Sequence, residues 1–113
     1  MRICVCGGRD YNDKETVWRA LDTIKAIMPN FTLVHGDAKG ADSLADAWAR
    51  YNGIETDPFP ADWEKHGKSA GPIRNRQMIA SGIDLLLAFP GGRGTADMVA
   101  ACKKAEVVVK EIK

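Results

Sequence analysis

The stretch DLLLAFPGGRGTADM, residues 84–98, joins a short apolar run to a loop of one proline and three glycines. The run at 84–89 is apolar on both faces, which is typical of a central strand covered by helices on both sides. A helical pattern begins at about residue 95. A strand that leads through a glycine-rich turn into a helix is one unit of a parallel α/β sheet.

The same alternation extends over the whole chain. We expect strands at 2–6, 31–35, 54–58, 84–89 and 106–112, and helices at 13–28, 41–51, 72–81 and 95–105. Asn12 and Glu15 resemble a capping box for the first helix, and residues 60–71 show no periodicity. Right-handed crossovers then predict an α/β fold over residues 1–113, a single-domain Rossmann-like three-layer sandwich whose parallel sheet has the strand order 3-2-1-4-5.

The composition is that of an ordinary globular protein, with 45% hydrophobic and 27% charged residues. A net charge of +1 argues against a nucleic-acid partner held by bulk charge. The chain has no apolar run of transmembrane length and no signal-peptide pattern, so we expect a cytoplasmic protein without a membrane partner. Cys4, Cys6 and Cys102 are expected to be reduced and the first two to be buried, and we expect neither a metal nor a cofactor.

Glycine-rich loops follow the first, second and fourth predicted strands, at 7–10, 36–40 and 90–95. The ends of parallel strands meet at one edge of a sheet, where each following helix points its free N–H groups. Five basic residues fall in these loops or early in the third helix, namely Arg9, Lys39, Arg74, Arg76 and Arg93. The pattern predicts a small ligand that carries phosphate. The spacing matches neither a Walker loop nor a dinucleotide fingerprint.

Four blocks of sequence carry a resemblance to a known family: GGRDY (7–11), HGDAKGAD (35–42), ADW…HGKSAGPIRNRQMI (61–79) and AFPGGRGTADM (88–98). Together they resemble the YspA/YpsA-like branch of the SLOG superfamily over essentially the whole chain. That superfamily includes the LOG-type phosphoribohydrolases and the Rossmann-like domain of DprA. The resemblance implies a nucleotide or nucleotide-derived ligand. Members of the SLOG superfamily commonly form homodimers. Trp18 lies off the apolar stripe of its helix and is a candidate subunit contact.

The resemblance also implies roles for individual residues. The PGG-x-GT loop would hold phosphate through backbone N–H groups and a hydroxyl, and the glycines of the other two loops would line the same cleft. With the basic residues added, the expected ligand-binding set is Gly7, Gly8, Arg9, Gly36, Asp37, Lys39, Arg74, Arg76, Gly91, Gly92, Arg93, Gly94 and Thr95.

The LOG-type enzymes cleave the N-glycosidic bond of nucleoside monophosphates with an arginine and a glutamate. Arg76 is the match for the arginine, but the position of the glutamate is occupied by Met98, which cannot act as an acid or a base. Asp97 lies one place earlier, so the candidate catalytic residues are Arg76, Asp97 and Asp37. Ligand binding is therefore the first hypothesis and N-glycosidic cleavage the alternative. A single-stranded nucleic-acid module is the weakest, because the aromatic residues do not interleave with basic ones.

Three residues have two readings each. Asp37 either accepts a ribose hydroxyl or caps the helix that begins near residue 41. Trp63 either stacks on a base as part of a lid or docks the polar segment onto the body. His35, at the end of an apolar strand, is expected to be a core histidine rather than a functional one.

Overall fold

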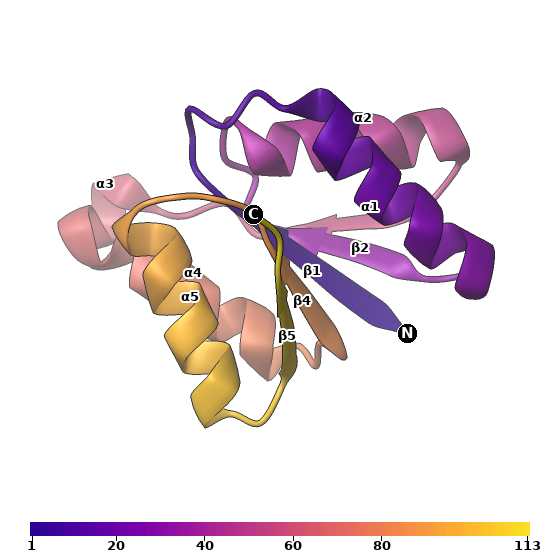
Figure 1. Cartoon of the computed structure of the whole chain (residues 1–113). Coiled ribbons are helices and arrows are strands. Elements are labelled where there is room, and N and C mark those ends of the chain that lie inside the picture. Colours follow the sequence, from indigo (N-terminus) through magenta and orange to yellow (C-terminus); the bar gives the residue numbers. More distant parts are fainter.

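Five parallel strands form one sheet in the order β3-β2-β1-β4-β5 (Figure 1). The computed structural model describes all 113 residues. The strands are β1 (Arg2–Cys6), β2 (Thr32–His35), β3 (Thr56–Pro58), β4 (Leu85–Ala88) and β5 (Val108–Glu111). β1 is central and pairs with β2 on one side and β4 on the other, with Ile3 opposite both Leu33 and Leu85. The predicted fold class and strand order are confirmed.

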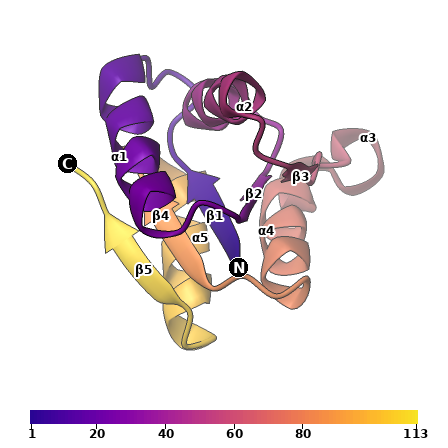
Figure 2. The same ribbon diagram turned by 90° about the vertical axis from the view of Figure 1, so that its right-hand side faces the viewer.

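Helices cover both faces of the sheet (Figure 2). They are α1 (Lys14–Ile27), α2 (Ala41–Asn52), α3 (Trp63–His66), α4 (Ala70–Ala80) and α5 (Arg93–Lys104). Because side chains alternate along a strand, Ile3 and Val5 pack into the core beneath α1 and α2. Cys4 and Cys6 point the other way, into a second core beneath α4 and α5. Both cysteines are buried and free, as predicted.

The structure corrects several predicted boundaries, and β3 and β5 each begin two residues later than predicted. Residues 60–71 are not a plain loop: they contain α3 and a 3₁₀ turn, η1 (Gly67–Ser69), and α4 begins at Ala70 rather than at Pro72. A single helical turn is too short to show a period, which is why the pattern missed it. α5 begins two residues earlier than predicted.

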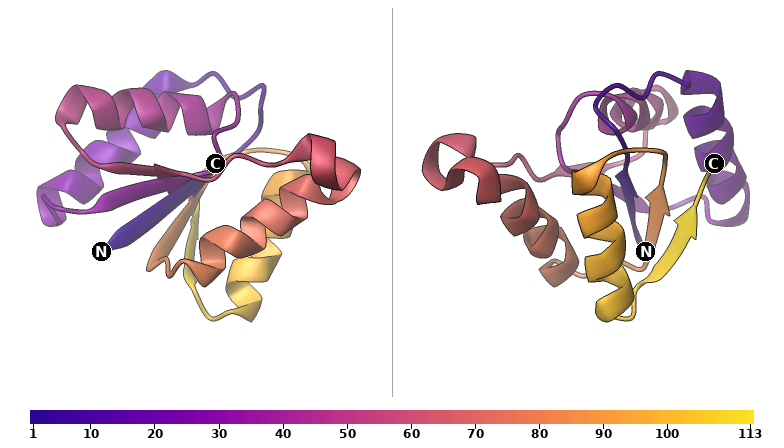
Figure 3. Two further views of the ribbon diagram at one scale, coloured as in Figure 1. Left: turned by 180° about the vertical axis from the view of Figure 1, so that it is seen from behind. Right: turned by 60° about the vertical axis from the view of Figure 1, so that its left-hand side comes forward.

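Helix α1 is capped by Asp13 rather than by Asn12. The Asp13 carboxylate accepts a hydrogen bond from the Thr16 N–H at 3.1 Å. Asp62 caps α3 in the same way, because its carboxylate accepts from the Lys65 N–H at 3.1 Å. α3 projects from the body of the molecule beside the start of α4 (Figure 3). None of the helices is both long and apolar enough to cross a membrane.

Candidate functional site

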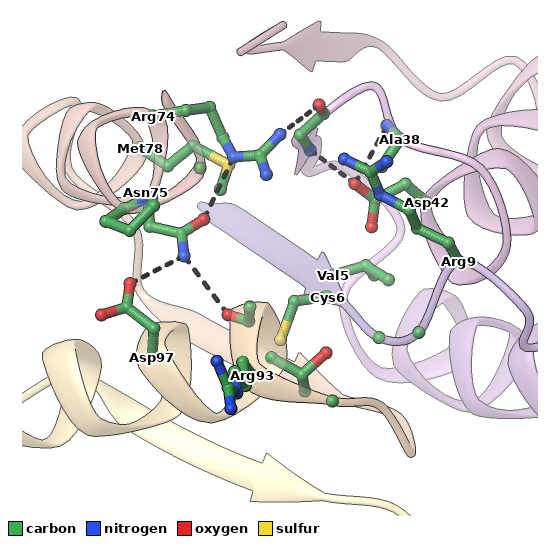
Figure 4. Close-up of a pocket in the computed structure, with 18 of the residues that line it drawn as sticks. Val5, Cys6, Arg9, Ala38, Asp42, Arg74, Asn75, Met78, Arg93 and Asp97 are labelled. Atoms are coloured by element: carbon green, nitrogen blue, oxygen red, sulfur yellow. Dashed lines mark hydrogen bonds between the residues drawn. The ribbon is translucent and has the colours of Figure 1, made fainter. Parts of the chain in front are cut away.

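A cavity of about 580 Å³ opens over the carboxyl ends of the central strands, between the three glycine loops (Figure 4). The strand order reverses here, between β1 and β4, which is where open α/β sheets bind their ligands. The volume falls within the usual range for a small-molecule site. The expected site residues that line it are Gly7, Gly8, Arg9, Gly36, Arg74, Gly92, Arg93, Gly94, Thr95 and Asp97.

The remaining expected residues lie outside this cavity. Asp37 and Lys39 line a neighbouring hollow that shares Arg9, Gly36 and Arg74 with it. Gly91 lines a third hollow beside α5 and β5. Arg76 is absent from the lining but contacts it through an ion pair with Asp97.

Asp37 does not cap α2. Its backbone has a φ of 54°, and its N–H donates a hydrogen bond to Nδ1 of His35 at 3.0 Å. The N-cap of α2 is Gly40, with no side-chain hydrogen bond. His35 itself is 2% exposed, and its Nε2 lies 3.0 Å from Oδ1 of Asp46. The reading of His35 as a satisfied core residue is therefore confirmed.

The first glycine loop lies between the other two and contacts both. The Gly8 N–H donates to the Pro90 carbonyl at 2.9 Å, and the Ala41 N–H donates to the Gly8 carbonyl at 3.3 Å. Gly40 has a φ of 77°, and a Cβ there would lie 2.0 Å from the Gly8 carbonyl oxygen. Gly91 is equally crowded, since its Cβ would lie 2.6 Å from the Gly8 nitrogen. These glycines allow the loops to pack against one another.

Gly92 and Gly94 differ from the packed glycines. A Cβ on either would meet nothing within 4 Å. Gly92 is the N-cap of α5 and offers no side-chain hydrogen bond to the helix. The N–H groups of Arg93, Gly94 and Thr95 consequently have no acceptor in the protein. Such a helix start carries a partial positive charge and free donors, a suitable environment for an anion.

Four basic side chains line the cavity: Arg9, Lys68, Arg74 and Arg93. None of them forms an ion pair. Lys68 was not expected in the site, because it lies in the segment without periodicity. Arg9 places its guanidinium 5.1 Å from the ring centre of Trp63, which lines the cavity and is 47% exposed.

Asn75 connects the loops across the cavity and was missed by the sequence analysis. It is 4% exposed. Its Oδ1 accepts from Nε of Arg74 at 3.1 Å, and its Nδ2 donates to the Gly94 carbonyl at 3.3 Å. Arg74 in turn donates from Nη1 to the Gly36 carbonyl at 2.5 Å. A polar residue at a helix position that faces the core is the one signal that could have identified Asn75.

Two carboxylates line the cavity, and their surroundings differ. Asp42 is 5% exposed, and its Oδ2 accepts from the N–H groups of Gly36 at 2.9 Å and Ala38 at 3.4 Å. Burial raises the pKa of Asp42. Asp97 accepts from Nη1 and Nη2 of Arg76 at 2.7 and 3.1 Å. These hydrogen bonds from Arg76 lower the pKa of Asp97.

Both carboxylate oxygens of Asp97 have partners within the protein, and its Oδ2 also accepts from Asn75 at 3.0 Å. Met98, at the position of the family's glutamate, is fully buried in the core beneath α4 and α5. Cys6 reaches the floor of the cavity, but burial raises its pKa well above the usual range. The thiolate is the nucleophilic form of cysteine, so Cys6 is a packing residue.

Trp18 makes a contact within the chain and also lines a surface hollow on α1, so its role as a subunit contact stays a prediction. It is half-buried, and its Nε1 donates to the Leu44 carbonyl at 3.1 Å, which ties α1 to α2. The homodimer stays a prediction.

The fold and the cavity define a Rossmann-like protein with a cavity lined by basic side chains at the switch point of its sheet. A family model described as YAcAr, the YspA, cpYpsA-related SLOG family, matches residues 1–66. The Gene 61 protein of Mycobacterium phage D29 is 42% identical over 116 residues, covering 96% of this chain and 93% of that protein. The chain belongs to the YspA, cpYpsA-related SLOG family, as the motifs implied.

Two solved structures share the fold. The structure of TM1055 matches with a TM-score of 0.76 at 12% identity, over 96% of this chain and 71% of that one. DNA processing protein A (DprA) from Streptococcus pneumoniae matches with a TM-score of 0.57 at 16% identity, over 96% of this chain and 58% of that one. At such low identities the likeness concerns the fold, and the site must be interpreted from its own residues.

Proposed function

We propose that this chain binds a nucleotide or a nucleotide-derived phosphate ligand in the cavity between the three glycine loops. The observation that carries the proposal is the set of basic side chains without an ion-pair partner that line the same cavity as the open start of α5. Phosphate would accept hydrogen bonds from the free N–H groups of Arg93, Gly94 and Thr95. Membership of the SLOG family agrees with a nucleotide-related ligand.

The charge balance of the lining supports an anionic ligand. Four basic side chains face two carboxylates, and Asp97 is already neutralised by Arg76 from outside the lining. The cavity is therefore positive although the chain as a whole has a net charge of only +1. Binding a phosphate would give these unpaired cations a partner.

An aromatic ring at the mouth supports a ligand with a base attached. Trp63 lies at the edge of the cavity, roughly half-exposed, with Arg9 over its ring. An exposed indole face is a platform on which a nucleobase stacks. Trp63 would thus stack on the base as part of a lid, the first of the two roles that the sequence predicts for it.

The test is a thermal-shift panel of mononucleotides, NAD, ADP-ribose and cyclic dinucleotides on three proteins: wild type, Gly92→Asp and Gly92→Ala. A ligand at a hundred times its dissociation constant adds about 2.7 kcal/mol to the stability, or on the order of 10 °C. Gly92→Asp should abolish the shift, because it places a carboxylate at the phosphate position. Gly92→Ala, with the same Cβ and no charge, should retain much of it.

The unliganded Gly92→Asp protein should be at least as stable as wild type. The position is open, and aspartate is a favourable N-cap for α5. A loss of binding is therefore not a loss of folding. A shift that survives in Gly92→Asp, or no shift with any compound, contradicts the proposal.

N-glycosidic cleavage is the second candidate, favoured by one observation. Arg76, the match for the arginine of the LOG-type enzymes, pairs at 2.7 Å with Asp97, the carboxylate next to the position of their glutamate. Each well of the panel should also be assayed for free base and ribose 5-phosphate. Release that Asp97→Ala abolishes would establish cleavage. Binding without release identifies a binding module.

A further inference from the structure

Asp42 has one carboxylate oxygen without a partner in the protein. Both of its hydrogen bonds, from Gly36 and Ala38, go to Oδ2. Every fully enclosed side-chain oxygen or nitrogen in this structure has a partner, so the unpartnered Oδ1 must be open to the cavity. Figure 4 shows this oxygen pointing into the cavity from the α2 side. A carboxylate that is otherwise buried thus presents a single acceptor to the ligand.

A free carboxylate oxygen attracts a hydrogen-bond donor of the ligand and repels an anionic group. A phosphate beside Asp42 would meet a like charge in a partly desolvated site, so the phosphate belongs at the start of α5 near Arg93. Trp63, a half-exposed residue of the lining, offers a ring on which a base can stack. What lies between phosphate and base in a nucleotide is the sugar, whose hydroxyl groups are donors.

Asp97 differs from Asp42, because neither of its oxygens lacks a hydrogen-bond partner in the protein. Its two oxygens accept three hydrogen bonds from Arg76 and Asn75. Asp37 faces the neighbouring hollow rather than this cavity. Asp42 is therefore the one carboxylate of the cavity with an oxygen that accepts no hydrogen bond from the protein.

We propose that Asp42 is the specificity-determining residue of the site: its Oδ1 accepts a hydrogen bond from the 2-hydroxyl of the ligand's sugar, so the site selects ribose phosphates over 2-deoxyribose phosphates. This inference rests on the proposed function, because it takes the phosphate to be held at α5. A hydrogen bond to a charged group contributes enough to give a preference of about tenfold or more.

The experiment is an NMR titration of the full chain with two probes, ribose 5-phosphate and 2-deoxyribose 5-phosphate. They differ by one hydroxyl and carry no base, so the unknown base does not affect the comparison. Wild type should bind ribose 5-phosphate about tenfold more tightly. This ratio requires no variant, so it does not depend on whether a substituted protein folds.

Two variants test whether Asp42 causes the difference in affinity between the two probes. In Asp42→Asn the amide oxygen can still accept from Gly36 and Ala38, so the loop is kept while the charged acceptor is lost. The preference should fall to within about twofold, with 2-deoxyribose 5-phosphate bound at least as tightly as by wild type. Arg93→Gln is the matched control. It should weaken both probes by the same factor and leave the ratio unchanged.

The outcomes separate the two proposals. Equal binding of both probes by wild type, or a ratio that persists in Asp42→Asn, overturns the role of Asp42 and leaves the phosphate site standing. If neither probe changes the chemical shifts of Gly92, Arg93 and Gly94, the phosphate site is overturned. The role proposed for Asp42 then fails with it.

Discussion

The two walls of the cavity are built in opposite ways. The α2 wall consists of the loop 36–40 and Asp42, and the α5 wall consists of the loop 90–95 and Asp97. On the α2 wall, the carboxylate is 5% exposed and satisfies backbone N–H groups of its own loop. On the α5 wall, the carboxylate is 28% exposed and pairs with a side chain, while three backbone N–H groups have no acceptor.

The difference separates the hydrogen bonds that the protein makes by itself from those that only a ligand would make. The backbone of the α2 wall is closed, because Gly40 packs on Gly8 and Arg74 holds the Gly36 carbonyl, and only Oδ1 of Asp42 is left without a partner. The α5 wall leaves donors and open glycines at the cavity. The same residue types, glycine and aspartate, therefore have different consequences on the two walls, and substitutions at matched positions test this.

The largest expected effect comes from adding one methyl group to each wall. Gly40→Ala forces a side chain onto a backbone with φ of 77° and against the Gly8 carbonyl. Strain and overpacking should lower the free energy of unfolding by about 3 kcal/mol, on the order of 15 °C in the melting temperature. Gly94→Ala, in open space within α5, should leave stability unchanged or raise it by up to about 1 kcal/mol. Denaturant unfolding measures both, and equal losses would contradict the distinction between the walls.

A smaller effect of opposite sign is expected for Asp42→Asn. Because burial raises the pKa of Asp42, the folded protein loses stability as pH rises above the ordinary titration range of a carboxyl group. The neutral amide avoids this loss and should raise the free energy of unfolding at pH 7 by about 1 kcal/mol. The gain should disappear near pH 4, where the wild-type carboxyl is also protonated. A variant less stable than wild type at pH 7 would show that the charge itself supports the α2 wall.

The smallest effect is expected for Asp97→Asn on the α5 wall. The pKa of Asp97 is lowered by its hydrogen bonds from Arg76, so its contribution is present above the ordinary carboxyl range and is lost as pH falls through the lowered pKa. Since the pair is largely exposed, the variant should lose less than about 1 kcal/mol at pH 7. The difference from wild type should shrink on acidification and in high salt. Unfolding curves between pH 3 and pH 7, with and without salt, provide the check; a loss that is independent of both would contradict an electrostatic cause.

The sequence was sufficient for the topology and for the edge at which the site lies. Alternating strand and helix patterns predicted the order 3-2-1-4-5, and the loops that follow β1, β2 and β4 do border one cavity. The short helix α3 was missed because one turn has no period to detect. Its capping residue, Asp62, and the later Lys68 both lie in that segment.

The choice among the carboxylates could not be made from the sequence. Asp37, Asp42 and Asp97 are all close to glycine loops, and the sequence pattern predicts Asp37 and Asp97, but not Asp42, as site residues. The backbone of Asp37 turns to positive φ, which directs it to the neighbouring hollow, whereas Asp42 faces the cavity from the first turn of α2. Asn75 was missed because its partners, Arg74, Gly94 and Asp97, come together only when α4 packs beside α5.

By itself, the amino-acid sequence determined the sheet, its helical layers, the family and the three loops, because periodicity, turn chemistry and local motifs act over a few residues. Only the tertiary structure decided which glycines pack and which remain open, and which carboxylate offers a free oxygen. Those properties depend on contacts between residues far apart in the chain, as between Gly8 and Pro90 or between Arg76 and Asp97. Burial and hydrogen bonding at such contacts set the charge state of each group, and hence what the cavity can bind.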